Sequence, residues 1–382
     1  MRNAIIGIVV GAVVGMVVGV TVVAPRLDNP PGGVGAATPD AVSGAPTPAP
    51  SLQLPPRPSA QPAVRLRMGS AYTGTTPLLG TLAKRVESEV WKVSAGTVEI
   101  RFHEPDSLVP VAAMFDAVAS GTLDAAFASP RLWEEQIPAL SLYGGIPFGP
   151  AAAEYLAWFD FGGGARLFEE IHHRHGVHAI LCGVATAKAA GWFRERIGAA
   201  SDLQGLRMRI DGLSAKVMAR LGVEPVPLDG GAVFAALEAG EIDAVAHWMP
   251  AVDLRLGFQD HLKHYYLLGW RQPATLLTLI VNRSSWEGLT APQRTQIEAV
   301  CGDNVRFGLA AGGSLQFAAL KELYAGGIQF HRWSTEIHEA LERAWREVVE
   351  EEAGTDTEFQ RVWQSLKSFR AEYAIWQELS RP

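Results

Sequence analysis

Hydrophobic positions along most of the chain follow two periods in turn. Short β-prone runs at residues 64–70, 97–102 and 123–128 are separated by segments of helical period, such as residues 77–93. The alternation resumes at Val177. Alternating strands and helices are typical of α/β folds built on largely parallel sheets. Two such sets in one chain predict an α/β protein with two lobes.

The second set and the C-terminal part complete this picture. We expect strands at residues 177–184, 206–210, 223–226, 242–247 and 275–282, helices at 111–119, 213–221 and 232–239, and mostly helix after Pro292. The resulting domain, residues 64–382, divides into a first lobe (about 64–184 plus 249–275), a second lobe (about 185–248 plus 276–335) and C-terminal helices (336–382). A cleft between hinged lobes is a common location for a small-molecule site.

The first 63 residues have a different texture. Residues 4–24 contain no charged side chain and are long enough for one transmembrane helix, so we expect residues 1–27 to be a membrane anchor or an uncleaved signal; a cleaved secretory signal is the alternative. Glycines at every fourth position favour helix association, which leaves a homodimer possible. Residues 28–63 are rich in proline and predict a disordered linker.

Composition excludes some classes of partner and site. The chain has 382 residues, is 48% hydrophobic and has a net charge of −7, which argues against binding to nucleic acid. Two cysteines, Cys182 and Cys301, are too few for a disulfide framework or a cysteine-based zinc site. Arg2 before the apolar run weakly places the N-terminus in the cytoplasm and the folded part outside the inner membrane.

Motifs for common cofactors and nucleophiles are not found. The sequence has no phosphate-binding loop of the Walker type, no dinucleotide fingerprint after a strand and no nucleophile elbow. His172, His173, His175 and His178 are the densest group of metal-capable side chains, but we find no acidic or cysteine partner at ligand spacing. We therefore expect no metal site, no cofactor and no catalytic residue.

Cationic and aromatic residues gather between positions 188 and 250. Arg209 lies at the end of an expected strand, where the following loop would face a cleft, and its planar guanidinium suits a carboxylate. Arg207 lies on the same face of that strand, so the pattern alone does not choose between the two. A surface ion pair is the ordinary role of either arginine.

Three segments of this region, in order, carry a family resemblance: DLQGLRMRI (202–210), LGVEPVP (221–227) and AALEAGEID (235–243). They resemble the solute-binding subunits of tripartite ATP-independent periplasmic (TRAP) transporters, the DctP family. The likeness extends from about Arg65 to the C-terminal helices. Gly191-Trp-Phe193 and the segment from Tyr265 to Trp270 resemble the branch that binds 2-oxo acids.

The resemblance implies a two-lobed, type II-like periplasmic binding fold that closes on a small organic acid and delivers it to membrane permease subunits, without catalysis. The family's carboxylate-clamping arginine corresponds to Arg209. The resemblance also implies aromatic walls, for which the candidates are Tyr72, Tyr143, Trp192 and Trp270, with His247 where the branch often has tryptophan.

The 2-oxo-acid branch also uses a cation, held by a glutamine and a glutamate. Lys188 stands at the glutamine position and Ala246 at the glutamate position, so both ligating side chains are missing. We hypothesise that the Lys188 ammonium replaces the ion. Together with Arg209 it would suit a 2-oxo monocarboxylate or a short dicarboxylate.

Two alternatives remain open at this point. A membrane-tethered sensory subunit would use the same binding site, and a desolvated Lys188 could form a Schiff base with a keto acid, which would make the protein an enzyme.

Overall fold

The computed structural model of the protein describes residues 63–228, 231–267 and 270–380, which all belong to one compact unit, Arg57–Pro382. The expected anchor and, except for Ala63, the expected linker lie outside these ranges. Within them, every helix is either too short or too polar to cross a lipid bilayer.

The first sheet has five strands in the order β2-β1-β3-β10-β4. They are β1 (Val64–Ser70), β2 (Val98–His103), β3 (Ala125–Ala128), β4 (Val177–Thr186) and β10 (Ala274–Asn282). β1 is parallel to β2 and β3, whereas β10 is antiparallel to β3 and β4. Side chains of β3 alternate between two core clusters, which means that both faces of the sheet are covered.

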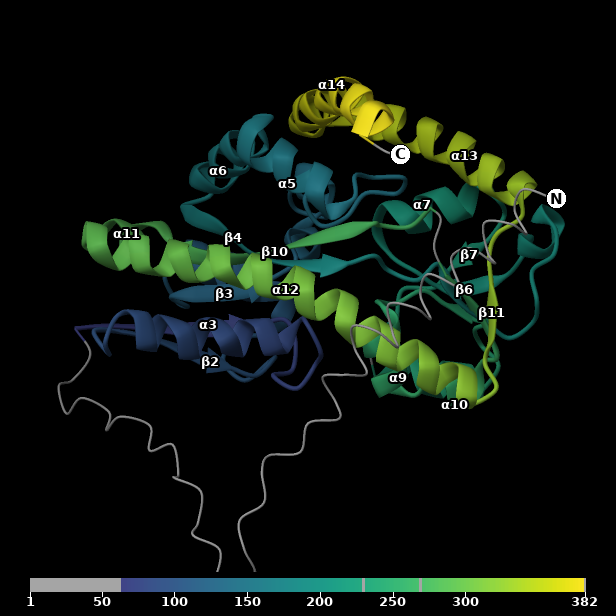
Figure 1. Cartoon of the computed structure of the whole chain (residues 1–382), viewed down its shortest axis with the longest axis horizontal. Coiled ribbons are helices and arrows are strands. Elements are labelled where there is room, and N and C mark those ends of the chain that lie inside the picture. The colour runs from purple at the N-terminus through teal and green to yellow at the C-terminus, as the bar shows by residue number, and fades with distance from the viewer. Residues whose placement is uncertain (1–62, 229–230, 268–269, 381–382) are drawn as a thin grey trace, which may run out of the picture. The chain divides into compact units, whose positions relative to one another are not determined.

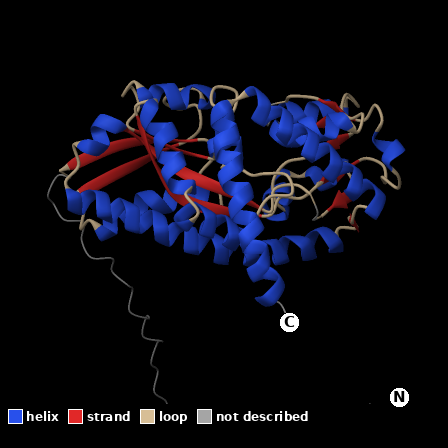
Figure 2. Cartoon of the chain, turned by 90° about the horizontal axis from the view of Figure 1, so that it is seen from above, coloured by secondary structure: helices blue, strands red, loops and turns tan. Residues whose placement is uncertain are grey.

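The second sheet has six short strands in the order β11-β9-β5-β8-β6-β7. They are β5 (Gly191–Phe193), β6 (Arg207–Arg209), β7 (Glu224–Pro225), β8 (Ala244–Val245), β9 (His264–Tyr266) and β11 (Gln329–His331). Figure 2 shows the long strands of the first sheet and the short strands of the second as two separate groups. This two-sheet α/β arrangement agrees with the expected fold class.

Sheet membership differs from the expected lobe boundaries in one region. β9 lies in the second sheet, although residues 249–275 were expected in the first lobe. β10 lies in the first sheet, although almost all of it was expected in the second lobe. The reason is that β10 runs antiparallel between β3 and β4, and hydrophobicity along a fully buried strand does not reveal its neighbours.

Helices surround both sheets. They are α3 (Gly80–Val93), α4 (Met114–Ala119), α5 (Ala152–Phe161), α6 (Gly164–Arg174), α7 (Gly212–Arg220), α8 (Ala232–Glu238), α9 (Pro250–Leu256), α10 (Phe258–His261), α11 (Arg283–Glu287), α12 (Ala291–Ala325), α13 (Thr335–Thr355) and α14 (Thr357–Ser380). The long helix α12 packs on β4 and α3 at one end and on α9 at the other, so it connects the two sheets (Figure 1). α13 packs on α7, whereas α14 packs on α5 and α6.

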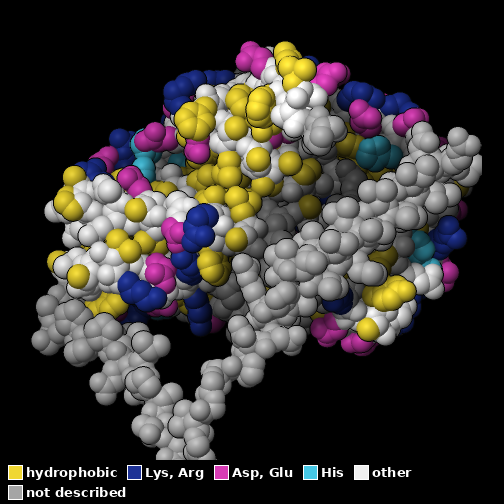
Figure 3. Space-filling view, viewed as in Figure 1, with side chains coloured by type: hydrophobic (Ala, Val, Ile, Leu, Met, Phe, Trp, Pro, Cys, Tyr) yellow, Lys and Arg dark blue, Asp and Glu magenta, His cyan; other side chains and the backbone are white. Residues whose placement is uncertain are grey.

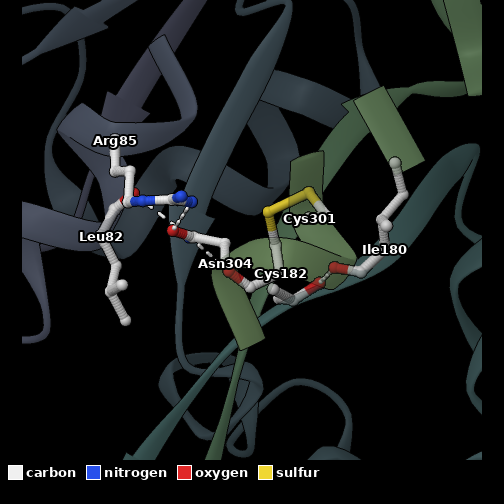
Figure 4. The surroundings of a disulfide bond; sticks show 7 residues. Leu82, Arg85, Ile180, Cys182, Cys301 and Asn304 are labelled. Atoms are coloured by element: carbon white, nitrogen blue, oxygen red, sulfur yellow. Dashed lines mark hydrogen bonds between the residues drawn. A yellow bond between two sulfur atoms is a disulfide. The ribbon is translucent and has the colours of Figure 1, made fainter. Parts of the chain in front are cut away.

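A disulfide fastens α12 to the first sheet. Cys182 of β4 is bonded to Cys301 of α12, and the amide of buried Asn304 donates to the Cys182 and Leu82 carbonyl oxygens over 2.7 and 3.3 Å (Figure 4). A β-carbon at Gly308 would lie 2.9 Å from the Val184 carbonyl oxygen, so the helix needs glycine there to approach the strand. A buried structural disulfide is typical of proteins that fold outside the cytoplasm.

Candidate ligand-binding site

A cavity of about 1040 Å³ lies between the two sheets. Its lining comes from segments that follow the carboxyl ends of strands in both sheets, which is where open α/β sheets bind ligands. From the first sheet, Tyr72 follows β1, Ser129 and Arg131 follow β3, and Lys188 follows β4. From the second sheet, Arg209 ends β6 and Asp211 lies in the next turn, while His247 and Trp248 follow β8.

Arg209 ends β6 and lines the cavity, as expected for the carboxylate-clamping residue. Its Nε donates to the Leu228 carbonyl oxygen over 3.2 Å and its Nη1 to the Ala246 carbonyl oxygen over 3.0 Å. Nη1 also lies 3.2 Å from Asp211 Oδ2. Arg207, two residues earlier, is instead held outside the cavity lining by a two-pronged contact to Asp243, with distances of 2.8 and 3.0 Å. The structure thus separates two arginines that the sequence pattern did not.

Arg131 is a second guanidinium in the cavity, and sequence reasoning missed it. It lies in the short 3₁₀ helix η3 (Pro130–Trp133), directly after the buried strand β3. Its Nη1 lies 3.2 Å from Asp211 Oδ1 and 3.3 Å from Glu134 Oε1. Its position after the carboxyl end of an expected strand was a signal that could have found it.

Asp211 connects the two guanidiniums. Burial raises the pKa of Asp211, but Arg131, Arg209 and nearby cations outweigh burial, so the pKa lies well below its usual range. Burial opposes the charge of Arg131 as well, and Asp211 and Glu134 together raise the Arg131 pKa. Glu134 differs, because burial raises its pKa more than Arg131 lowers it. Asp211 is therefore ionised and holds two cations in place.

Lys188 is a third cation in the lining, and only 4% of its surface is exposed. Its Nζ lies 3.9 Å from the ring centre of Trp248, a cation–π distance. Among the described residues, the Nζ has no hydrogen bond and no carboxylate within ion-pair distance, and only its backbone N–H is engaged, with Gln272. Burial, with Arg131 and Arg271 nearby, lowers the pKa of Lys188 well below its usual value.

Tyr72 and His247 are two further expected residues in the lining. Tyr72 packs edge-on against Trp248, with ring centres 5.8 Å apart, and its hydroxyl accepts a hydrogen bond from Ser129 N–H over 3.0 Å. The Nδ1 of His247 lies 3.4 Å from Asp253 Oδ1. Burial lowers the pKa of His247 although Asp253 opposes it, so the imidazole is neutral near pH 7.

The other three expected residues, Trp192, Tyr143 and Trp270, are fully buried and do not line this cavity. Trp192 stacks on Tyr265, with ring centres 3.9 Å apart, and donates to Asp253. Tyr143 donates to the Gly164 carbonyl oxygen in the core of the first sheet. Their roles toward a ligand stay predictions.

The cation implied by the family resemblance does not fit these side chains. Hard cations such as Ca²⁺ need several oxygen ligands. The position expected to supply an amide oxygen carries the Lys188 ammonium, and the position expected to supply a carboxylate is buried Ala246. The carboxylates beside them, Asp211 and Glu134, already contact arginines.

Comparisons with known proteins agree with this architecture. Residues 68–355 match the family described as bacterial extracellular solute-binding protein, family 7 (DctP). A monocarboxylate 2-oxoacid-binding periplasmic protein of Nostoc sp. is 33% identical over 322 residues, which cover 84% of this chain and 87% of that protein.

Solved structures of TRAP solute-binding proteins are also similar. One from Bordetella bronchiseptica, with co-purified calcium and picolinate, is 30% identical with a TM-score of 0.80, covering 84% of this chain and 95% of that one. One from Colwellia psychrerythraea, with bound calcium and pyruvate, is 28% identical with a TM-score of 0.77, covering 83% and 97%. The family match spans most of the described residues, and the fold agrees with it. This chain therefore belongs to the DctP family of bacterial extracellular solute-binding proteins.

Proposed function

We propose that this protein is the periplasmic solute-binding subunit of a TRAP transporter, that it captures a small organic acid, foremost a 2-oxo monocarboxylate, and that it delivers the acid to the membrane permease. Membership of the DctP family supports the transport role. The Nostoc relative named for 2-oxo monocarboxylates and the Colwellia protein with bound pyruvate support the ligand class. A short dicarboxylate is the second ligand class that Arg131, Lys188 and Arg209 suit.

The observation that carries this proposal is the unpaired charge of Lys188. Arg131 and Arg209 share Asp211, so their charges are partly neutralised within the protein. Lys188 has no such partner among the described residues, although it is buried at the cavity wall. Burying an ammonium without a counter-ion is costly, and a bound anion would remove that cost.

This arrangement suggests a role for each side chain. Arg209 and Arg131 bind the ligand carboxylate, since their outer N–H groups converge on the space beside Asp211. Lys188 donates to the keto oxygen and stands where the resemblance to the 2-oxo-acid branch implies a ligand of the bound cation. Trp248 and Tyr72 form an apolar wall that excludes water and strengthens these charge-assisted hydrogen bonds.

A ligand series tests the proposal by calorimetry on the protein. We expect pyruvate to bind, propionate to bind more weakly by roughly 1.5–3 kcal/mol because it lacks the oxygen that Lys188 would contact, and uncharged lactamide not to bind. Malonate tests the dicarboxylate class. If none of the acids gave heat, or if lactamide bound as well as pyruvate, the proposed ligand class would be wrong.

Capture without chemistry is part of the proposal, and the lowered pKa of Lys188 makes a Schiff base the rival to test. Borohydride reduction in the presence of pyruvate, followed by mass spectrometry, distinguishes the two. We expect reversible binding and an unmodified chain. A reduced adduct on Lys188 would favour an enzyme.

The membrane tether also belongs to the proposal. An uncleaved helix at residues 4–24, followed by the proline-rich linker, would keep the solute-binding domain near the inner membrane and its permease. Cell fractionation tests this: we expect the full chain in the membrane fraction and a variant without residues 1–27, exported by a cleavable signal, in the soluble periplasm.

A further inference from the structure

Three potential metal ligands meet where α6 lies against the edge strand of the first sheet, and none of them lines the ligand cavity. Glu169 and His173 lie one turn apart on α6, and His178 is the second residue of the edge strand β4. Their ligand atoms all lie within 4.8 Å of one another. The sequence search for an acidic partner of these histidines missed Glu169, although a separation of four residues places it on the same helix face as His173.

Two of the three distances between these atoms are close to the edges of a metal coordination tetrahedron. His173 Nε2 lies 3.2 Å from His178 Nδ1 and 3.5 Å from Glu169 Oε1. Ligand atoms bound to zinc at about 2.0–2.2 Å in tetrahedral geometry lie roughly 3.3–3.5 Å from one another. The third distance, between the Glu169 carboxylate and His178 Nδ1, can shorten by rotation of the Glu169 side chain, which is 53% exposed.

The surroundings suit a bound cation. His178 is held by stacking on Trp286, with ring centres 4.3 Å apart and an interplanar angle of 13°, so its orientation is preset. A cavity of about 480 Å³ adjoins the cluster and is lined by Glu169 and His178 together with Asp160 and Glu298. This cavity leaves room for a water ligand, and its acidic side chains favour a positive ion.

We propose that Glu169, His173 and His178 bind a divalent transition-metal ion, Zn²⁺ foremost, with a fourth position open to water. Two imidazoles and one carboxylate are a ligand set that zinc accepts, and Ca²⁺ or Mg²⁺ would require more oxygen ligands. None of the three residues lines the cavity between the sheets, so this inference does not depend on the proposed transport function.

The test uses the full chain without an affinity tag, after metal removal with a chelator. Zn²⁺ is titrated by calorimetry, and Co²⁺ by visible absorption, which is strong for tetrahedral coordination. We expect one ion per chain and a blue cobalt complex. Glu169→Gln and His173→Asn should each weaken Zn²⁺ binding by more than about tenfold, since even the outer-shell partners of a metal site contribute about that much.

Two control variants keep the test specific. His175→Gln changes an exposed histidine at the same helix end, and His264→Asn breaks the other close histidine pair, His264 Nδ1 to His331 Nε2 at 2.9 Å. Neither should change Zn²⁺ affinity, and pyruvate affinity should be the same in Glu169→Gln as in the unmodified chain. The unfolding temperature of each variant is measured without metal, and only variants that match the unmodified chain in this value are compared. The inference would be overturned if the unmodified chain bound no stoichiometric Zn²⁺ ion, or if Glu169→Gln and His173→Asn bound Zn²⁺ as tightly as the unmodified chain.

Discussion

The cavity between the sheets and the contact between β4 and α12 differ in whether their buried polar groups have hydrogen-bond partners. At the β4–α12 contact, the amide of buried Asn304 donates to two carbonyl oxygens and its oxygen accepts from Arg85 over 3.3 Å, while both cysteines are joined. At the cavity wall, Lys188 Nζ contacts the Trp248 ring but has no hydrogen bond among the described residues. Behind it, two nitrogens of Arg271 and both side-chain polar atoms of Gln272 have no hydrogen-bond partner there. The first region satisfies its buried polar groups, whereas in the second Lys188, which lines the cavity, keeps its N–H donors available for a ligand.

The outer surface reinforces this contrast. On the visible part of the face in Figure 3, basic and acidic side chains are interspersed. The cavity lining also holds side chains of both signs, but three of its cations, Arg131, Lys188 and Arg209, gather around Asp211. Arg271 lies close to this group, and burial lowers its pKa to about 10. The local group around Asp211 therefore has more cations than carboxylates, which suits a small anion.

The largest expected effect is on ligand affinity. Arg209→Ala should weaken pyruvate binding by roughly 2–5 kcal/mol, because it removes one partner of a buried charged contact. Arg207→Ala is the matched control: it lies on the same strand but pairs with Asp243 outside the cavity, so affinity should hardly change. Calorimetry on both variants checks this. If Arg209→Ala bound pyruvate as tightly as Arg207→Ala, Arg209 would not belong to the site.

Removal of the disulfide should lower stability and leave ligand affinity unchanged. Replacing Cys182 and Cys301 by alanine removes a link across 119 residues of sequence and should lower the free energy of unfolding by about 2–4 kcal/mol. Pyruvate affinity at a temperature where the variant is folded should be unchanged, since neither cysteine lines the cavity. Denaturant unfolding measures the first quantity. A loss of affinity without a loss of stability would contradict the division between the two regions.

A smaller effect is expected from pH. The ammonium form of Lys188 must bind the anion, but burial, Arg131 and Arg271 lower its pKa in the free protein. A bound anion raises this pKa, so binding takes up a proton at a pH above the free-state pKa. Affinity should be constant below the free-state pKa and should fall above it by at most about tenfold, or 1.4 kcal/mol, per pH unit.

Calorimetry in buffers of different ionisation enthalpy measures this proton uptake. Lys188→Met is the control, because it keeps most of the side-chain volume and cannot titrate; it should show no proton uptake. The same pH dependence in both proteins would assign the effect to another group.

The smallest effect concerns the wall. Tyr72→Phe leaves Ser129 N–H without its acceptor and should reduce affinity or stability by only about 1 kcal/mol. The aromatic contact with Trp248 is retained in this variant. A loss as large as that of Arg209→Ala would mean that the Tyr72 hydroxyl contacts the ligand directly.

Sequence patterns predicted the long elements well. The expected strand at residues 64–70 coincides with β1, and that at 275–282 differs from β10 by one residue, because long apolar runs between turn signals are distinctive. β5, β9 and β11 were not expected, since three residues are too few to show a period. The disulfide could not be foreseen, because its cysteines are far apart in the sequence and meet only where α12 crosses β4.

The site was predicted in part for similar reasons. Arg209 lies within a recognisable motif and Lys188 shortly before another, and both line the cavity. Arg131 and Asp211 were missed because their role depends on contact between loops that follow β3 and β6, which belong to different sheets. Trp192 stands in the most recognisable motif, yet it lies in the core beside Tyr265 and Asp253, because a buried tryptophan packs and donates in the same way whether or not a ligand is near.

The most direct test of the central claim is calorimetry with pyruvate in sodium-free buffer containing a chelator, compared with the same buffer supplied with sodium or calcium. If Lys188 takes the place of the ion, the unmodified protein binds pyruvate equally in all buffers, and the Lys188→Gln/Ala246→Glu double variant, which supplies the two oxygen ligands that the family pattern implies, binds only when the ion is added. Binding by the unmodified protein that disappears on chelation and returns with one ion per chain would contradict the account.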